Sequence, residues 1–519
     1  MNCSLPLRPL LASCALIGLA ACTVGPDYEK PAAPVPATYK EVDGWKPATP
    51  KQAASGEPWW SIYSDPVLDG LEHQIDISNQ TLQASAAAYR LSQALVAEAR
   101  AGFFPTFDLT GSATRSGSGG GTGGSSSRGG SSSSGSSGGF SGGSRGGVAQ
   151  NSFQADADAS WAPDIWGAVR RTVESDVASA QQSAANLAAA RLSAQSALAA
   201  DYFQLRVEDE LAQLLNDETD AFSRSLQITE NRYKVGTAAK TDVMSATAQL
   251  ENARAQQIAT GVLRAEFEHA IAVLVGKPPA EFSIAAAKLP AAIPIAPADL
   301  PSQLLERNPT VAANERAMAS ANARIGVAVA GYFPNIQLGA SYGQQSSMLH
   351  TLFTAANSLW SFGLTNISLP IFNGGLTSAQ VAAARATYDE IVADYRQAVL
   401  VAFQQVEDEL AASRILEQQA MVQDRAVAAA REAERLALNQ YRAGTVDFTT
   451  VITAQATALS NEETAVNLHQ TRLVASVNLV EALGGGWNSQ QLPSVDEVES
   501  NSGASILSPP LPPPPVDKN

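Results

Sequence analysis

The hydrophobic and polar positions of this chain follow two patterns, a short one with period two and a long one with helical spacing. Period two occurs in four stretches that come as two pairs, about residues 103–115 with 148–161 and 332–345 with 357–370. The cleanest runs from Phe153 to Trp161, whereas the fourth loses its phase near Asn366. Alternation of this kind predicts strands with one apolar and one polar face. It suits membrane strands and soluble hairpins equally.

Long helical segments follow each pair of strands. Residues 167–233 and 376–441 contain no proline, and the first carries 11 alanines among residues 176–200. Apolar and small residues recur there at intervals of three and four from Val173 to Leu205, which predicts coiled-coil packing. An unbroken helix of this length would extend about 100 Å. Further helices are expected at about 65–100, 239–275, 310–330 and 448–483.

The same elements recur in the same order along the chain. Three motifs occur twice: Gly-Phe-Phe-Pro at 102–105 and Gly-Tyr-Phe-Pro at 331–334, Val-Glu-Asp-Glu-Leu at 207–211 and 406–410, and Tyr-x-x-Gly-Thr at 233–237 and 441–445. One such match could arise by chance, but three ordered matches indicate an internal duplication. Each copy would contain one pair of strands followed by long helices.

The repeated Tyr-x-x-Gly-Thr step predicts a sharp reversal of the chain. Glycine accepts the left-handed conformation that caps a helix C-terminus, so Gly236 and Gly444 are expected to end the two long helices. The next residues, Thr237 and Thr445, are expected to begin the following helices. The two turns would then form tips at the helix ends remote from the strands.

The N-terminus has the features of an export signal. Arg8 precedes an apolar run from Leu10 to Ala20, which is too short to span a bilayer as a helix. The run ends in Leu-Ala-Ala-Cys, which resembles the bacterial lipobox and implies acylation of Cys22. Several acyl chains on one cysteine would anchor the protein stably. The following Thr23, in place of the Asp that marks inner-membrane retention, implies the outer membrane; the alternative is an ordinary signal peptide with an accidental cysteine.

Two low-complexity segments are expected to remain unfolded. Residues 116–147 contain 28 Gly or Ser among 32, a composition that cannot form a core. Long loops on one side of a barrel are usual in outer-membrane proteins, so this segment favours the membrane interpretation of the strands. Near the C-terminus a proline-rich run from Pro509 to Pro515 predicts an extended tail.

Composition excludes several classes of protein. The net charge of −16 disfavours binding to the phosphate backbone of nucleic acid. All three cysteines lie within the first 22 residues, which excludes a disulfide framework and a thiolate metal site in the rest of the chain. The four histidines have no ligand-like spacing, so no metal site is expected. Without a nucleophile, metal or cofactor constellation, an enzyme is the least favoured interpretation.

These motifs together make the chain resemble the TolC-like outer-membrane efflux proteins, in particular their lipidated OprM-like (NodT) branch. The resemblance covers nearly all of the chain, from Cys-Thr-Val-Gly-Pro-Asp-Tyr at 22–28, through Trp59-Trp60 and the sequence at 301–307, to Leu-Gly-Gly-Gly-Trp at 483–487. Where relatives usually have Arg-Pro-Asp, this sequence has Asn308-Pro309-Thr310, and Thr310 is expected to cap the following helix.

The resemblance implies a mixed, mainly α fold. Three protomers would contribute four strands each to a twelve-stranded outer-membrane β-barrel, continued by a long periplasmic α-helical barrel with an equatorial domain. Elementary geometry requires an oligomer independently, because closing a barrel takes about eight strands or more. The implied localisation is the outer membrane, with a lipid anchor and a helical body in the periplasm.

The function implied by the resemblance is passive export. The homotrimer would conduct drugs or other small molecules from an inner-membrane pump of the RND type, reached through a periplasmic adaptor protein. The covalent lipid on Cys22 would be the only non-protein group, with no cofactor and no nucleic acid. A channel for type I protein secretion and a non-transporting adhesin or structural coiled-coil lipoprotein remain alternatives. The substrate and the identity of the pump cannot be read from this chain.

The resemblance also assigns roles to residues of the two tips. Tyr233, Gly236, Thr237, Tyr441, Gly444 and Thr445 would contact the adaptor. In relatives, acidic rings after the turns form the closed aperture. The matching position six residues after Gly236 is Asp242, and those six and nine residues after Gly444 are Thr450 and Thr453. Asp242, with Asp447 nearby, would therefore bear on gating. The two threonines put a strongly cation-binding aperture in doubt. Stabilisation of a helix N-terminus by the negative charge is the alternative role for both aspartates.

The predicted division of the chain follows the duplication. It comprises a signal peptide (1–21), a lipidated N-terminal segment (22–64), a first outer-membrane efflux repeat (65–276), a linker (277–300), a second repeat (301–487) and a disordered proline-rich tail (488–519).

Overall fold

The computed structural model describes residues 23–33, 35–36, 38–41, 58–116, 150–290, 292–294 and 301–501. The predicted signal peptide, Cys22, nearly all of the Gly/Ser segment and the proline-rich run lie outside these residues. The chain forms two compact units. The first comprises Met1–Pro26, Glu98–Val173 and Ile325–Ala382, and the second comprises Asp27–Ala97, Glu174–Arg324 and Ala383–Asn519.

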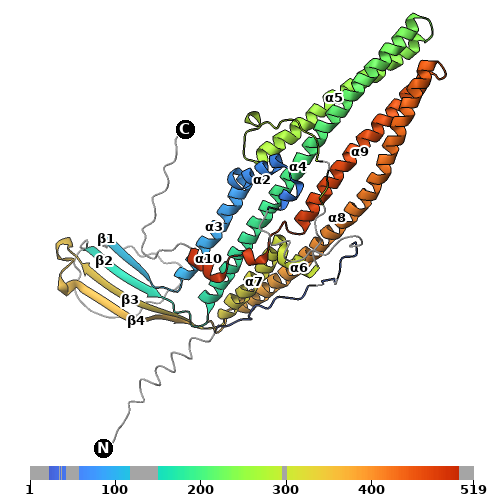
Figure 1. Ribbon diagram of the computed structural model, residues 1–519. Coiled ribbons are helices and arrows are strands. Elements are labelled where there is room, and N and C mark those ends of the chain that lie inside the picture. Colours follow the sequence, from blue (N-terminus) through green and yellow to red (C-terminus); the bar gives the residue numbers. More distant parts are fainter. Residues whose placement is uncertain are drawn as a thin grey trace, which may run out of the picture. The chain divides into compact units, whose positions relative to one another are not determined.

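The first unit contains a four-stranded antiparallel sheet in the order β1-β2-β3-β4 (Figure 1). Its strands are β1 (Thr106–Ser116), β2 (Gln150–Trp161), β3 (Asn335–Ser346) and β4 (Ser358–Ser368). The strands expected from residues 103 and 332 begin three residues later, because Phe103 and Tyr332 still belong to helical turns. Their N–H groups donate to the carbonyl oxygens three residues earlier, at 3.0 and 3.1 Å. The change of phase near Asn366 is a β-bulge that leaves Thr365 unpaired.

The two faces of the sheet differ sharply in polarity. Cross-strand partners share a face, so the register places Leu109, Ala157, Tyr342 and Trp360 on one face, and their neighbours two residues along extend it. Large apolar side chains of this face are open: Leu109 is 85% exposed and Trp360 is 77% exposed. The opposite face carries polar side chains, among them Asp108, which lies directly opposite Asp158. An exposed apolar face of this kind is suited to contact with lipid.

Helices account for most of the remaining described chain. They are α2 (Pro66–Ser78), α3 (Gln80–Ala101), α4 (Ala168–Lys234), α5 (Lys240–Leu274), α6 (Pro301–Arg307), α7 (Pro309–Ala330), α8 (Leu376–Ala443), α9 (Phe448–Ala482) and α10 (Val495–Asn501). The two longest, α4 and α8, contain 67 and 68 residues and each turns back into the helix that follows it (Figure 1). None of the helices in the described part of the chain is long and apolar enough to cross a membrane.

Two of the expected helical segments differ from the prediction at an asparagine, one in its middle and the other at its start. The segment at 65–100 breaks at the buried Asn79, whose Oδ1 accepts the N–H of Leu82 at 2.9 Å. Its Nδ2 donates to the carbonyl oxygen of Leu274 at 2.7 Å, which fixes the break against α5. At the start of α7, Asn308 Oδ1 accepts the N–H of Thr310 at 3.0 Å. Asn308 is therefore the cap, and the expectation that Thr310 caps this helix is wrong.

Two hydrophobic clusters form the centre of the second unit, one in each copy of the duplication. The first includes Phe203 of α4 and Leu68 of α2, both fully buried. The second includes Tyr395 of α8, which is also fully buried. Helix α9 contributes Val477 to the first cluster and Leu479 to the second. The last helix of the second copy therefore joins the cores of both copies.

The chain after residue 487 is ordered further than predicted. The expected disordered tail began at residue 488, but residues 489–491 form a short 3-10 helix and α10 follows. Leu492 packs against a cluster that contains Ala185 and Ala312. Gln181 Nε2 also donates to the carbonyl oxygen of Pro493 at 2.9 Å. These long-range contacts hold a segment whose own sequence has no helical periodicity.

Candidate functional site

The two predicted turns lie side by side at one end of the second unit (Figure 1). Gly236 and Gly444 have φ angles of +79° and +80°, which confirms that each occupies the left-handed cap. In both turns the glycine N–H donates to the carbonyl oxygen three residues earlier at 2.9 Å. An ideal Cβ on Gly236 would meet nothing within 4 Å. Glycine is therefore required at this position by the backbone conformation and not by a lack of room for a side chain.

The threonine after each glycine closes the preceding helix. The backbone N–H and the hydroxyl of Thr237 both donate to the carbonyl oxygen five residues earlier, at 2.8 and 3.1 Å. Thr445 makes the same pair of bonds, each at 3.0 Å. Ala239 and Asp447 hold the cap positions of α5 and α9. The expectation that the threonines begin the next helices is wrong, because their hydroxyls satisfy carbonyl groups left over at the ends of α4 and α8.

The two tyrosines of the repeated step are not equivalent. Tyr233 is 46% exposed, whereas Tyr441 is only 3% exposed. Arg232 of the first turn lies over the ring of Tyr441, with 4.5 Å between the guanidinium carbon and the ring centre, and also donates to the Tyr441 carbonyl oxygen. The position that corresponds to Arg232 in the second copy is Gln440, which cannot make a cation–π contact. No pattern along the chain predicted this bridge, although the Arg-to-Gln difference between the two copies signals it.

The two candidate aperture aspartates lie at the starts of α5 and α9. An Oδ atom of Asp242 accepts the backbone N–H of Ala239 at 3.3 Å, so its carboxylate is positioned to stabilise the helix N-terminus. Asp447 occupies the N-cap position of α9 without a capping bond from its side chain. The structure therefore gives Asp242 the geometry expected of a cap, and this geometry is compatible with a further role for its charge.

Thr450 and Thr453 lie together along α9, one turn apart. Both line a groove of about 430 Å³ whose other residues are Ala430, Ala433, Thr449, Ala454 and Thr457. The side chain of Thr453 donates to the carbonyl oxygen of Thr449 at 2.9 Å, so its polarity is partly satisfied within the helix. Asp242 is not among the residues of this groove. The structure thus groups the two threonines but does not bring them to the aspartate.

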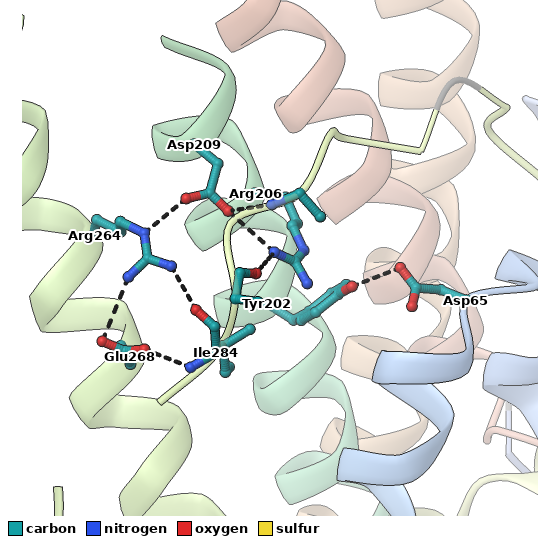
Figure 2. A network of polar contacts seen from close by, with 9 residues as sticks. Asp65, Tyr202, Arg206, Asp209, Arg264, Glu268 and Ile284 are labelled. Carbon is teal, nitrogen blue, oxygen red and sulfur yellow. Dashed lines mark hydrogen bonds and ion pairs between the residues drawn. The ribbon is translucent and has the colours of Figure 1, made fainter. Parts of the chain in front are cut away.

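The first copy of the Val-Glu-Asp-Glu-Leu motif belongs to a buried polar network (Figure 2). Asp209 accepts hydrogen bonds from Arg206 at 3.0 Å and from Arg264 at 2.7 Å, and it also accepts the N–H of Ala287 at 3.1 Å. Arg264 donates to the carbonyl oxygen of Ile284 at 2.7 Å. Because Ala287 and Ile284 lie in the extended linker, this network fastens the linker to α4 and α5.

The second copy of the motif uses a different carboxylate for a similar purpose. Glu407 accepts the backbone N–H groups of Lys40 and Glu41, at 2.7 and 3.0 Å. The side chain of Glu41 pairs in turn with Arg414 at 2.5 Å. Each copy therefore holds an extended segment against its long helix, the linker in the first copy and the N-terminal segment in the second. The identical motif predicted the duplication but not this division of roles.

Carboxylates also gather between the long helices. Glu218 of α4 lies near Glu434 of α8 and Glu462 of α9, and burial, followed by the charges of these two neighbours, raises its pKa to about 7. Arg431 pairs with Glu462 and partly offsets the repulsion. No period-based pattern identifies such a group, because its members come from three helices. Within the part of the chain that the structure describes, no three His, Cys, Asp or Glu side chains are arranged to hold a metal ion.

Comparison with known proteins identifies related chains along nearly the whole length. A family model described as outer membrane efflux protein matches residues 71–277 and 300–485. The chain is 28% identical over 497 residues to the probable efflux pump outer membrane protein TtgC of Pseudomonas putida, covering 95% of this chain and 97% of that protein. It is 29% identical to the pyoverdine export outer membrane protein OpmQ of Pseudomonas aeruginosa, covering 93% and 97%.

Solved structures agree with these matches. The structure of the outer-membrane channel OprN is similar to this chain with a TM-score of 0.79 and 27% sequence identity. The similarity covers 90% of this chain and 100% of that one.

Replacing Arg232 with Gln should loosen the second turn without unfolding the helices. The substitution removes the cation–π contact and the hydrogen bond to the Tyr441 carbonyl group, which together contribute on the order of 1–2 kcal/mol. We expect amide hydrogen exchange to accelerate by roughly tenfold at residues 441–451. The exposed Gln440→Ala change is the matched control and should leave exchange in both turns unaltered. Equal protection in Arg232→Gln and the unsubstituted protein would show that the bridge does not hold the turn.

Proposed function

Because the chain belongs to the outer membrane efflux protein family, it acts as the outer-membrane channel of an efflux system, and we propose that it does so with a periplasmic adaptor and an inner-membrane pump. Members of this family are channels, not enzymes. The observation that carries the function is the four-stranded sheet, with its apolar face exposed and β1 and β4 at its edges. Three copies supply the twelve strands that close a barrel, since four are too few.

The register of the sheet determines how such a barrel meets its surroundings. The face with Leu109, Tyr342, Trp360 and their neighbours contacts lipid, and the face with Asp108 and Asp158 lines the pore. Ser341 and Ser361 continue the pore-lining row across β3 and β4 and share a hydrogen bond at 2.8 Å. The conduit is therefore polar and hydrated, and it offers no chemistry to a passing solute. Export is driven by the pump.

Acylation of Cys22 anchors the protein to the outer membrane as well. The residue lies outside the described chain, but the residues after it are held firmly within the first unit. The N–H of Val24 donates to the carbonyl oxygen of Trp166 at 3.2 Å, and the side chain of Thr23 lies against Gly167. The ring of Trp166 stacks on Phe333 with 4.8 Å between ring centres. Paired aromatic rings beside the ends of β2 and β3 suit a membrane interface, where acyl chains on Cys22 would enter the bilayer.

The anchor is tested by metabolic labelling. Cells given radiolabelled palmitate should incorporate label into the unsubstituted protein and not into Cys22→Ser, because only the thiol of Cys22 carries the acyl group after signal cleavage. Cys14→Ser is the control, since Cys14 lies in the predicted signal peptide and is removed. Label that persists in Cys22→Ser, or is lost in Cys14→Ser, would contradict acylation at Cys22.

The two tips provide the surface for the adaptor. Tyr233 and Val235 are 46% and 73% exposed at the first turn, and Gly236 projects no side chain. At the second turn Gly444 and Thr445 are exposed as well, whereas Tyr441 is buried. Tyr441 therefore supports this surface from within and does not meet the adaptor directly. A pair of exposed turns at the ends of rigid helices can be contacted end-on by another helical hairpin.

Site-specific photocrosslinking in intact cells would identify the partners. A photoreactive amino acid at Val235 should form adducts with a periplasmic adaptor, and the pump should co-purify with them. The matched control is Ile258 of α5, which is 76% exposed but lies away from the turns. Adducts from Ile258 and none from Val235 would show that the adaptor binds away from the two turns. Recovery of a type I secretion exporter in place of an efflux pump would show that the cargo is protein and not a small molecule.

The charge of Asp242 is proposed to restrict the aperture. Three copies in the trimer would bring three carboxylates to one opening, where they retain cations that obstruct the flow of ions. Asp447 lies next to the second turn at the position that corresponds to Ala239, whereas the counterpart of Asp242 is Thr450, and neither Thr450 nor Thr453 brings a charge. The restriction therefore comes from three charges, one in each protomer, although each protomer has two turns with nearly the same backbone geometry.

Conductance of purified trimers in planar bilayers separates the charge of Asp242 from its capping bond. Asp242→Asn keeps an oxygen that can accept the N–H of Ala239 but loses the charge. We expect both Asp242→Asn and Asp242→Ala to raise the closed-state conductance severalfold. If conductance changes only in Asp242→Ala, or in neither variant, the side chain acts solely as a helix cap.

A further inference from the structure

A cavity of about 580 Å³ lies in the second unit where the two copies of the duplication meet. Its walls come from the middle of α4, the start of α7, the middle of α8 and the end of α9. The apolar part of the lining consists of small or branched side chains, such as Ala190, Val401 and Ala402. This volume lies in the range of pockets that hold small organic molecules and is far larger than a bare ion requires.

Two carboxylates face this cavity. Glu409, from the second Val-Glu-Asp-Glu-Leu motif, accepts a hydrogen bond from Asn478 Nδ2 at 3.2 Å, and Glu481 lies one turn further along α9 from Asn478. Burial raises the pKa of both carboxyl groups. None of the described residues that line the cavity is a lysine, arginine or histidine. The negative charges of this cavity therefore lack a cationic partner within it.

The two helix ends at this cavity are both capped, so its negative charge comes from the two carboxylate side chains. Residues 478–482 form the last turn of α9, at the negative end of its helix dipole. The carbonyl groups of Leu479, Val480 and Glu481 there accept N–H groups of the residues that follow, at 2.9 to 3.0 Å. The start of α7 carries the positive end of its own helix dipole. Asn308 Oδ1 already accepts the N–H groups of Thr310 and Val311 there, at 3.0 and 3.1 Å. The positive end of α7 is therefore largely compensated.

The duplication shows that this charge pattern is specific to one junction. Counting from the matched glycines Gly276 and Gly484, Glu481 corresponds to Val273 in the first copy, and Asn478 corresponds to Ala270. Glu409 has a counterpart, Glu210, but it does not line the cavity. A general structural need of the fold would be expected in both copies. The pairing of two carboxylates with an amide at one junction points to recognition of a ligand instead.

We propose that this cavity binds an organic cation, with the positively charged nitrogen of an amine between Glu409 and Glu481 and its hydrocarbon body against the Ala and Val walls. An ammonium group can pair with both carboxylates while Asn478 keeps its bond to Glu409. Burying such a ligand also removes apolar surface from water. This goes beyond the conduit function, because it gives the channel a saturable binding site, present three times in a trimer.

Ethidium is a suitable probe, since it joins a permanent positive charge to an apolar aromatic body and its fluorescence anisotropy reports binding. Titration into purified trimers in detergent should show saturable binding. Glu481→Gln and Glu409→Gln should each weaken it by roughly tenfold, because each removes one of the two negative charges that attract the cation. Glu210→Gln is the matched control and should leave the affinity unchanged. The anion fluorescein should not compete.

Several results would overturn the proposal. Equal ethidium affinity in Glu481→Gln and the unsubstituted trimer would mean that the probe binds elsewhere or only partitions into detergent. An equal loss in Glu210→Gln would point to a general effect of negative charge. Size-exclusion chromatography must show intact trimers for every variant; if both cavity variants dissociate, Val401→Trp, which fills the cavity without altering charge, must abolish binding for the proposal to stand. The assay uses no pump, so a negative result leaves the channel function unaffected.

Discussion

The constraint on which the rest of the structure depends is the pairing of backbone groups at the edges of the sheet. Strands β1 and β4 each have one hydrogen-bonded neighbour among the described strands of the protomer. A membrane offers no water to satisfy the other side of each strand, so an open edge is too costly there. The exposed apolar face excludes the alternative of a sheet in water. Only closure with further copies meets both conditions, and this makes the pore a property of the assembly.

Duplication supplies two similar halves, but the contacts that matter most treat them differently. Arg232 bridges from the first turn to Tyr441 of the second, and Gln440 cannot return the contact. The repeated acidic motif holds the linker through Asp209 in one copy and the N-terminal segment through Glu407 in the other. The two copies thus repeat the order of strands and helices and the geometry of the glycine turns, while their polar contacts differ. Any gating or recognition that depends on charge inherits this asymmetry.

Buried polar groups lie where the packing of the helices against their neighbours is most specific. Arg206 and Asp209 are 2% and 4% exposed, and burying such a pair costs free energy unless each group is fully hydrogen-bonded. The bonds of Arg206 and Asp209 to the linker meet that condition for Asp209, whereas the Nε of Arg206 has no hydrogen-bond partner in the described part of the chain. Glu218 and its neighbours meet it only in part, which is why the pKa of Glu218 rises to about 7. The cavity with Glu409 and Glu481 is a third case, in which the missing partner is proposed to be a ligand.

The sequence by itself determined the strands, the long helices, the duplication and the two glycine turns. Each of these depends on period or on the backbone freedom of single residues, such as Gly236 and Gly444, and both are local properties. Only the tertiary structure decided where helices break at Asn79 and Asn308, why Thr237 closes a helix, and which carboxylates face a cavity. These outcomes depend on which helices lie side by side, and no pattern along one segment contains that information.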